Sequence, residues 1–351
     1  MGLEKSFEVE PIDEGGELGA ILRPKLALSV EELAALFEEE RSAVDEALLQ
    51  YGALLLRGSA TSTPQEFERV AKSLTRGLKN DYLGTSPRNA VTEYVHNASE
   101  LPPFYPIPQH CEMSFVANPP ERLLFSCHIA PAAPGGETPI ADFRRMLDDL
   151  DPNVRERFER LGVRIVRNYR SSAARGAGPF QLKPWDALFG TEDREEIERI
   201  CEQNDFSAQW IEGDRLRLIH FQAATRPHPA DGRPIWFNHS QVFHPSQARG
   251  EYRRIAERYG RLKMRTLSVV ASALSAMERA VNGEDGLAMN CTYGDGSPIS
   301  FAEMEAVRDA IWKNMRIVPW ERGDVLLLDN FRVAHGRMPY KGPRQIHVAW
   351  S

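Results

Sequence analysis

The sequence lacks the features of a membrane or secreted protein. No hydrophobic run approaches the ~18–20 residues that a membrane-spanning helix needs. The first residues, 1–12, are acidic and do not show the basic-then-apolar pattern of a secretory signal. These absences predict a cytoplasmic protein that has no membrane partner.

Cysteine is scarce, and positive charge is not in surplus. The four cysteines form no Cys-x-x-Cys pair, which argues against a zinc knuckle or a thioredoxin-like site. In a reducing compartment we expect them to be free thiols. The formal net charge is −7, from 43 basic and 50 acidic residues. Nucleic-acid-binding proteins usually carry a basic surplus or stripe, so no nucleic-acid partner is expected.

Nucleotide-binding loops and internal repeats are also missing. The chain has no GxGxxG sequence, no Walker-type loop and no repeat of fixed period. Hydrophobic residues make up 42% and charged residues 26% of the 351 positions, an ordinary globular composition with enough length to bury a core. No polar linker divides the chain, so we predict one domain over residues 1–351.

Residue patterns predict strands along the whole chain and helices in separate groups. Capped amphipathic patterns predict helices over 30–50 and 63–74, with a buried strand over 52–58 between them. Further strands are expected over 122–130, 138–143, 163–169, 214–224, 233–238, 325–330 and 344–350, and further helices over 144–162, 185–204 and 249–280. Strand and helix do not alternate regularly, which argues against a doubly wound parallel sheet. We predict an α+β fold with an antiparallel jelly-roll core, N-terminal helices and a helical insertion at about 246–320.

Two histidines and one glutamate have the residue types of an iron-ligand set. His110 and Glu112 are two apart, and on a strand such residues share a face, roughly 6.5 Å apart at Cα. The proline-rich approach to His110 favours extended backbone there. His335 follows the predicted strand 325–330. A single His-x-Glu is weak evidence, but two imidazoles and a carboxylate are the ligand set of non-haem Fe(II) oxygenases.

Two further residues have the chemistry to bind an anionic co-substrate. Arg344 opens the last predicted strand, on a face that is otherwise apolar. A buried arginine there needs an anionic partner, and a carboxylate can accept hydrogen bonds from two of its N–H groups at once. Thr138 follows a glycine-rich turn and offers a hydroxyl for the same group. The ordinary alternatives are a surface arginine and a threonine that merely starts a strand.

Four segments, in this order along the chain, share the form of one known family. They are QHCEMSF (109–115), GGETPIADFRR (135–145), RPIWFNHSQVFHP (233–245) and DNFRVAHGRMPYKGPRQIHVAW (329–350). Together they resemble the taurine dioxygenase/TfdA-like family of Fe(II)/2-oxoglutarate-dependent oxygenases. The resemblance implies a double-stranded β-helix core, with His110, Glu112 and His335 as iron ligands. It implies that Thr138 and Arg344 bind 2-oxoglutarate, with O2 as the second co-substrate.

The form of the motifs is closest to members from natural-product pathways, which commonly hydroxylate amino-acid units. The resemblance therefore implies hydroxylation of an unactivated C–H of a small molecule or a carrier-tethered amino acid, with succinate and CO2 as co-products. Phe115, Phe237 and Asn238 are candidates for the substrate wall. Members that act on small anions often carry a second arginine four residues after the first. Val348 stands there, so a substrate anion must be held elsewhere or be masked as a carrier thioester.

Two other functions stay open at the level of the sequence. A zinc-dependent metallohydrolase could use the same three ligands, although Arg344 and Thr138 would then have no role. A non-catalytic jelly-roll module could bind a small organic acid, although such a module needs no open metal position. The oligomeric state cannot be read from the sequence, so a homo-oligomer also stays open.

Overall fold

Two facing sheets form the centre of the protein, seen in a computed structural model that describes residues 2–13, 15–16, 18–84, 88–174 and 182–351. Within those residues the larger sheet has the strand order β1-β2-β3-β15-β6-β17-β4, and the smaller has β14-β7-β16-β5. The larger sheet contains β1 (Phe7–Pro11), β2 (Ala20–Pro24), β3 (Ala53–Leu56), β15 (Val325–Asp329), β6 (Arg122–Ile129), β17 (Gln345–Trp350) and β4 (His96–Asn97). The smaller contains β14 (Met315–Arg316), β7 (Ile140–Asp142), β16 (Val333–Arg337) and β5 (Ile107–His110). This double-stranded β-helix is the jelly-roll core that the sequence predicted.

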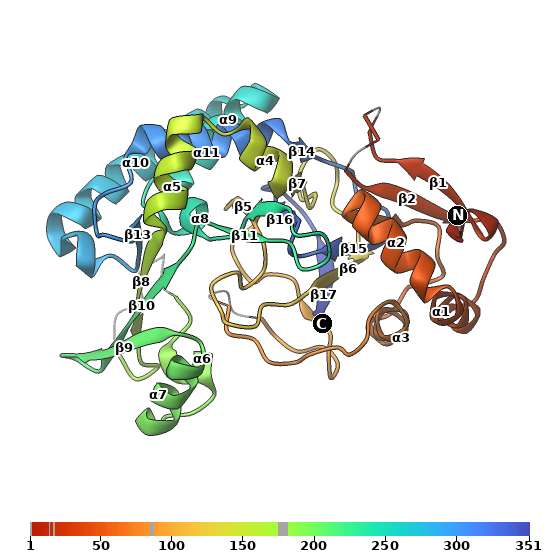
Figure 1. Cartoon of the computed structure of the whole chain (residues 1–351), viewed down its shortest axis with the longest axis horizontal. Coiled ribbons are helices and arrows are strands. Elements are labelled where there is room, and N and C mark those ends of the chain that lie inside the picture. The colour runs from red at the N-terminus through yellow and green to blue at the C-terminus, as the bar shows by residue number, and fades with distance from the viewer. Residues whose placement is uncertain (1, 14, 17, 85–87, 175–181) are drawn as a thin grey trace.

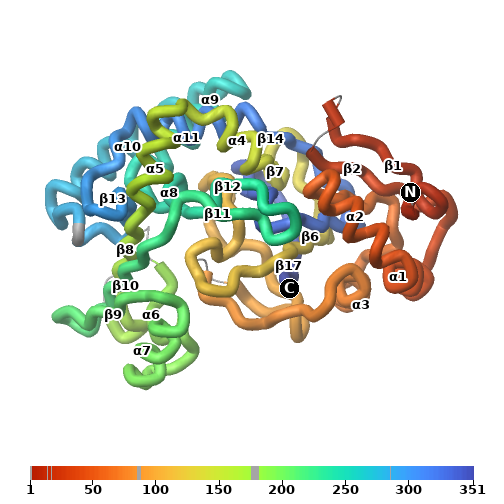
Figure 2. Tube along the Cα trace, in the orientation of Figure 1, coloured from red at the N-terminus to blue at the C-terminus, as the bar shows by residue number. Residues whose placement is uncertain are grey.

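The central strands of the larger sheet are buried on both faces. In β3, Leu55 faces the smaller sheet, whereas Leu54 and Leu56 face the opposite side. Strand β15 lies antiparallel to both β3 and β6, which places residues more than 200 positions apart side by side. Figure 2 shows the dark blue C-terminal strand β17 in the middle of the fold beside β6. Burial on both faces explains why these strands read as continuous apolar runs.

Three helices cover the outer face of the larger sheet (Figure 1). They are α1 (Val30–Glu39), α2 (Arg41–Tyr51) and α3 (Pro64–Leu74). Ser29 and Thr63 start α1 and α3 with capping boxes, as their sequence patterns predicted. The single helix expected over 30–50 is wrong, because Glu40 leaves helical geometry (φ −95°, ψ 21°) and divides it. The break lets α1 pack on α3 while α2 contacts β3 and β15.

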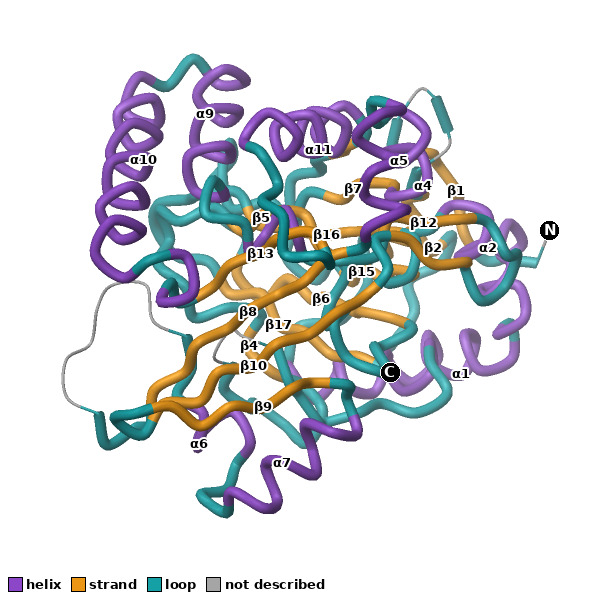
Figure 3. Tube along the Cα trace, turned by 60° about the vertical axis from the view of Figure 1, so that its left-hand side comes forward, coloured by secondary structure: helices purple, strands orange, loops and turns teal. Residues whose placement is uncertain are grey.

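A third sheet and the remaining helices build the other half of the molecule. Figure 3 shows its strands side by side in the order β13-β8-β10-β9, with α9 and α10 adjacent at one edge. The strands are β8 (Val163–Arg170), β9 (Phe206–Ile211), β10 (Arg215–Gln222) and β13 (Met289–Tyr293), and a separate ribbon pairs β11 (Thr225–Pro227) with β12 (Pro234–Trp236). The helices are α4 (Phe143–Asp149), α5 (Pro152–Leu161), α6 (Trp185–Phe189), α7 (Arg194–Gln203), α8 (Ser240–Phe243), α9 (Gln247–Tyr259), α10 (Leu262–Asn282) and α11 (Phe301–Lys313). Two short 3-10 turns lie at Leu3–Lys5 and Glu284–Gly286.

The span predicted as a helical insertion, 246–320, is mostly but not entirely helical. It supplies α9, α10 and α11, but also β13, which extends the third sheet, and β14, which pairs with β7. The span is therefore joined to the sheets by backbone hydrogen bonds as well as by packing. Among the helices that the structure describes, none is long and apolar enough to cross a membrane.

Candidate metal centre and co-substrate pocket

The strand pair β5–β16 brings the two predicted histidine ligands together. His335 and His110 are direct partners in the antiparallel ladder, although 225 positions separate them in sequence. Their ring centroids lie 4.5 Å apart. Gly336 follows His335 and allows the close approach of the strands, since a Cβ there would lie 2.5 Å from the carbonyl oxygen of Ile107. The ladder thus fixes two imidazoles side by side on rigid backbone.

Glu112 reaches the same place from a turn and not from a strand. Strand β5 ends at His110, so the expectation that both residues lie on one strand is wrong. The turn continues through Met113, whose φ is 49°. The fully buried Asn330 clamps it: the Glu112 N–H donates to Asn330 Oδ1 at 2.7 Å, and Asn330 Nδ2 donates to the Glu112 carbonyl oxygen at 3.0 Å. The sequence of residues 109–115 does not by itself predict these two hydrogen bonds to Asn330.

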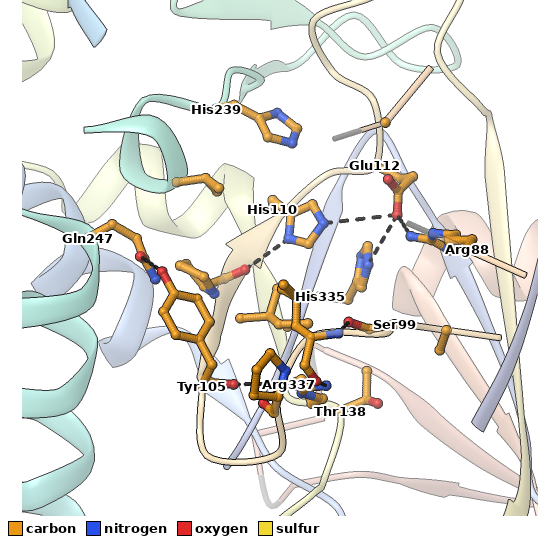
Figure 4. Close-up of a pocket in the computed structure, with 18 of the residues that line it drawn as sticks. Arg88, Ser99, Tyr105, His110, Glu112, Thr138, His239, Gln247, His335 and Arg337 are labelled. Carbon is orange, nitrogen blue, oxygen red and sulfur yellow. Dashed lines mark hydrogen bonds and ion pairs between the residues drawn. The ribbon is translucent and has the colours of Figure 1, made fainter. Parts of the chain in front are cut away.

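The three side chains surround a common point with groups that suit a cation (Figure 4). One ligand atom from each of His110, Glu112 and His335 lies within 4.8 Å of the others. The Glu112 Oε2 atom is 4.0 Å from His110 Nε2 and 3.7 Å from His335 Nε2. His110 Nδ1 is 2.9 Å from the Pro108 carbonyl oxygen, which only accepts, so Nδ1 carries the proton of the neutral ring. His110 Nε2 therefore turns a lone pair toward a carboxylate oxygen, an arrangement that fits a metal ion between them.

Burial keeps the imidazoles neutral, the form that binds a metal. Burial lowers the pKa of His110, against the opposing charge of Glu112. Burial also lowers the pKa of His335 far below its ordinary value, and the neighbouring His110 adds to the effect. Burial alone would raise the pKa of Glu112, but the positive charge of Arg88 and its hydrogen bond hold it below the usual range.

The predicted co-substrate residues meet at the other end of the same cavity. Arg344 precedes β17, and Thr138 precedes β7. Arg344 Nη2 lies 3.4 Å from Thr138 Oγ1, and Arg344 Nε donates to the Gly136 carbonyl oxygen at 2.7 Å. Among the described residues no carboxylate pairs with Arg344, and burial lowers the pKa of its guanidinium to about 10. An unpaired cation and a hydroxyl at a cavity wall fit the carboxylate of an organic acid.

A cavity of about 310 Å³ connects the two groups. Figure 4 shows Glu112 and His239 toward one end of it and Thr138 and Arg337 toward the other. Ser114 Oγ lies 2.5 Å from His239 Nδ1, which fixes the ring beside that of His110. The volume suits a small substrate together with a small organic acid.

Of the three residues predicted for the substrate wall, the structure places only Phe115 at this cavity. Phe237 stacks on Phe331 with ring centroids 5.3 Å apart. Asn238 donates to the Ala224 carbonyl oxygen and accepts from the Ser240 N–H, so it organises its own loop. Arg88 and Arg337 line the cavity without having been predicted, and so does His239, for which the family-like segment 233–245 had left a pocket role open. No sequence pattern predicts the contact of Arg88 with Glu112 or the contacts of Arg337 with backbone carbonyl groups.

Comparison with known proteins gives the family. The protein-family model described as "Taurine catabolism dioxygenase TauD, TfdA family" matches residues 8–350 of the sequence. The chain belongs to this family. It is an Fe(II)/2-oxoglutarate-dependent dioxygenase, as the TauD/TfdA-like resemblance of its motifs implied, with O2 as the other co-substrate. The zinc hydrolase and the non-catalytic binding module are therefore set aside.

Individual TauD/TfdA relatives match most of the chain. The dapdiamide synthesis protein DdaC of Enterobacter agglomerans is 31% identical over 306 residues, 87% of this chain and 84% of that protein. A clavaminate synthase-like protein of Arabidopsis thaliana, At3g21360, is 26% identical over 352 residues, 98% of this chain and 94% of that protein. The crystal structure of PvcB from Pseudomonas aeruginosa matches with a TM-score of 0.54 and 15% identity, covering 98% of this chain and 91% of that one. At this identity the PvcB match supports the fold alone.

Proposed function

We propose that this dioxygenase hydroxylates an unactivated C–H of a small, amino-acid-derived molecule in a natural-product pathway. In this proposal His110, Glu112 and His335 hold Fe(II), and Thr138 and Arg344 hold 2-oxoglutarate. The observation that carries it is one cavity with two complementary ends: facing acceptor atoms that fit a cation at one end, and, among the described residues, a guanidinium without a carboxylate partner that fits an anion at the other. The substrate is a small molecule, since the cavity is about 310 Å³.

The biosynthetic part of the proposal draws on two relatives. DdaC is named for dapdiamide synthesis, and PvcB is described as an Fe, alpha-ketoglutarate dependent oxygenase from an isonitrile synthetic pathway. Both names refer to the making of a specialised molecule and not to the breakdown of a nutrient. Glu112 fills the third ligand position with a carboxylate and leaves no room there for a chloride ion, which supports oxygen insertion over halogenation as the outcome.

The residues of the chain prepare the reaction by fixing geometry and excluding water. When bound, Fe(II) supplies the activation of O2, with electrons from the oxidative decarboxylation of 2-oxoglutarate to succinate and CO2. Asn330 holds the backbone of Glu112, and Pro108 fixes the ring of His110. Arg344 stays protonated at neutral pH, because its pKa of about 10 lies well above 7, and so it can hold a carboxylate. Phe115 and Phe125 give the cavity an apolar wall that limits water.

The visible spectrum under anaerobic conditions tests the metal and co-substrate assignments together. Wild-type protein with Fe(II) and 2-oxoglutarate should show a weak metal-to-ligand charge-transfer band. His335→Ala should lose the band, and Arg344→Ala should need roughly 10- to 100-fold more 2-oxoglutarate to develop it, because a charge-assisted contact is removed. Arg194→Ala on the exposed side of α7 is the control and should match wild type. No band in folded, iron-loaded wild type would contradict the assignments.

A further inference from the structure

Among the described residues three arginines line the cavity, and Arg88 is the one whose guanidinium keeps two buried nitrogen atoms without a hydrogen-bond partner. Arg337 donates to three carbonyl oxygens, those of Leu101 at 3.0 Å, Pro102 at 2.7 Å and Tyr105 at 2.9 Å. Arg344 is assigned to 2-oxoglutarate. Glu112 is the one carboxylate among the described residues of the cavity lining, and it serves the metal. The cavity therefore has more positive charge than its own residues and 2-oxoglutarate account for.

The guanidinium of Arg88 is held in place but only partly satisfied. Its side chain is 5% exposed, and Nη2 lies 2.5 Å from Glu112 Oε2. Its Nε and Nη1 atoms are buried and have no hydrogen-bond partner within the described part of the chain. The rings of Tyr82 and Trp350 lie against it, with centroids 4.6 Å and 5.7 Å away, so they fix the plane of the group. A buried guanidinium with free N–H groups is unfavourable unless an acceptor joins it.

The position of Arg88 suits an anionic acceptor on the substrate. The Glu112 oxygen that it contacts is the same Oε2 that faces both histidines. A metal ion held by Glu112 would compete with Arg88 for the charge of this carboxylate, and the guanidinium could then pair with a second anion. A carboxylate matches the planar, multiple-donor geometry of arginine better than a neutral group does. A substrate held there places its neighbouring carbons beside the metal ligands.

Resting on the proposed function, we propose that Arg88 binds a carboxylate of the substrate, which is therefore a free carboxylic acid and not a carrier-bound thioester. A thioester carbonyl oxygen can accept a hydrogen bond, but it has no negative charge to pair with the guanidinium of Arg88. The free acid gives Arg88 an anionic partner of its own. The assignment also supplies an anchor for a substrate anion in a different segment from Arg344, which precedes β17.

Paired acids and amides test the assignment on the loaded enzyme. Wild type, Arg88→Gln, Arg88→Lys and the surface control Arg194→Gln are loaded anaerobically with saturating Fe(II) and 2-oxoglutarate, and loading is verified by the charge-transfer band. Each is then titrated with acetate and with the twenty proteinogenic amino acids and their α-carboxamides. Binding is followed by the change in the band and by equilibrium dialysis. The amide removes the charge of the acid while keeping its size, so each pair isolates the ionic contact.

We expect at least one acid to bind wild type tenfold or more tightly than its amide. Arg88→Gln should lose roughly 10- to 100-fold of the affinity for the acid and keep the affinity for the amide, because only the charged contact is removed. Arg88→Lys keeps the charge without the planar donors and should lose less. It also carries the comparison if Arg88→Gln does not retain iron. Arg194→Gln should equal wild type.

Three outcomes overturn the assignment while the charge-transfer band of wild type is intact. They are equal acid affinity in wild type and both Arg88 variants, equal affinity of wild type for acid and amide, and no binding of any acid to wild type. A missing band in iron-loaded wild type is a different failure, because it removes the proposed metal and co-substrate sites themselves.

Discussion

At the residue scale, the buried amide of Asn330 connects the backbone near the metal ligands to the sheet. It binds the N–H and carbonyl oxygen of Glu112 and the carbonyl oxygen of Pro120. Asn330→Ala should lower the free energy of unfolding by about 2–4 kcal/mol, because it leaves buried backbone groups unpaired. It should also weaken Fe(II) binding, because the turn that aims Glu112 loosens. Chemical denaturation and metal titration measure the two effects, and an unchanged metal affinity would contradict the orienting role.

The two proposed histidine ligands predict a definite dependence of metal binding on pH. Burial lowers the pKa of both His110 and His335, so both stay neutral at neutral pH. Protonation competes with the metal only once the pH falls below the ordinary histidine pKa of about 6.5. We therefore expect the affinity for Mn(II), measured by calorimetry, to be nearly constant from pH 8 to 7 and to fall steeply on acidification. Equal affinity at pH 7 and at strongly acidic pH, in folded protein, would rule out these ligands.

At the element scale, the metal site depends on the contact between β5 and β16. A Cβ on Gly336 would lie 2.5 Å from the Ile107 carbonyl oxygen and would also crowd the Gln109 side chain. Gly336→Ala should therefore push the strands apart, disturb the pairing of His110 with His335, and lower metal affinity at least tenfold. Gly15→Ala is the matched control, because a Cβ there would meet only the carboxylate oxygens of Asp13, at 3.8 and 3.9 Å. Metal titration of the two variants compares them, and equal affinities would show that the strand contact does not set the site.

Sequence patterns predict the strands and capped helices here better than they predict the turns. The apolar runs of β3 and β15 and the capping boxes at Ser29 and Thr63 are local signals, and each forms the expected element. The turn that carries Glu112 is set by Asn330, 218 positions away, which no local pattern contains. The ligand residue types could be predicted because the chemistry of a metal centre requires them. Arg88 could not, because its contact with Trp350 joins residues far apart in the sequence.

At the scale of the whole molecule, buried histidines should make the metal-free protein sensitive to acid. Burial lowers the pKa of His220, His244 and His347 to about 4, and these residues lie in three separate parts of the fold. In the unfolded chain each takes up a proton near pH 6.5, so between pH 6.5 and 4 the unfolded state binds more protons than the folded state. The stability they contribute is therefore present above pH 6.5 and is lost as the pH falls toward 4, by up to about 3 kcal/mol for each histidine.

His244 allows this acid sensitivity to be tested at one position. Its ring nitrogens lie 2.7 Å from Ser246 Oγ and 3.0 Å from the Ile299 carbonyl oxygen, which ties the end of α8 to the start of α11. His244→Asn should lower the free energy of unfolding at pH 7 by about 1–3 kcal/mol, through lost hydrogen bonds. It should also reduce the further loss between pH 7 and 5, because one titrating group is gone. Urea unfolding at both pH values, with Arg194→Gln as the control, measures both effects. A pH-independent stability in the wild type would mean that the buried histidines take up protons without unfolding.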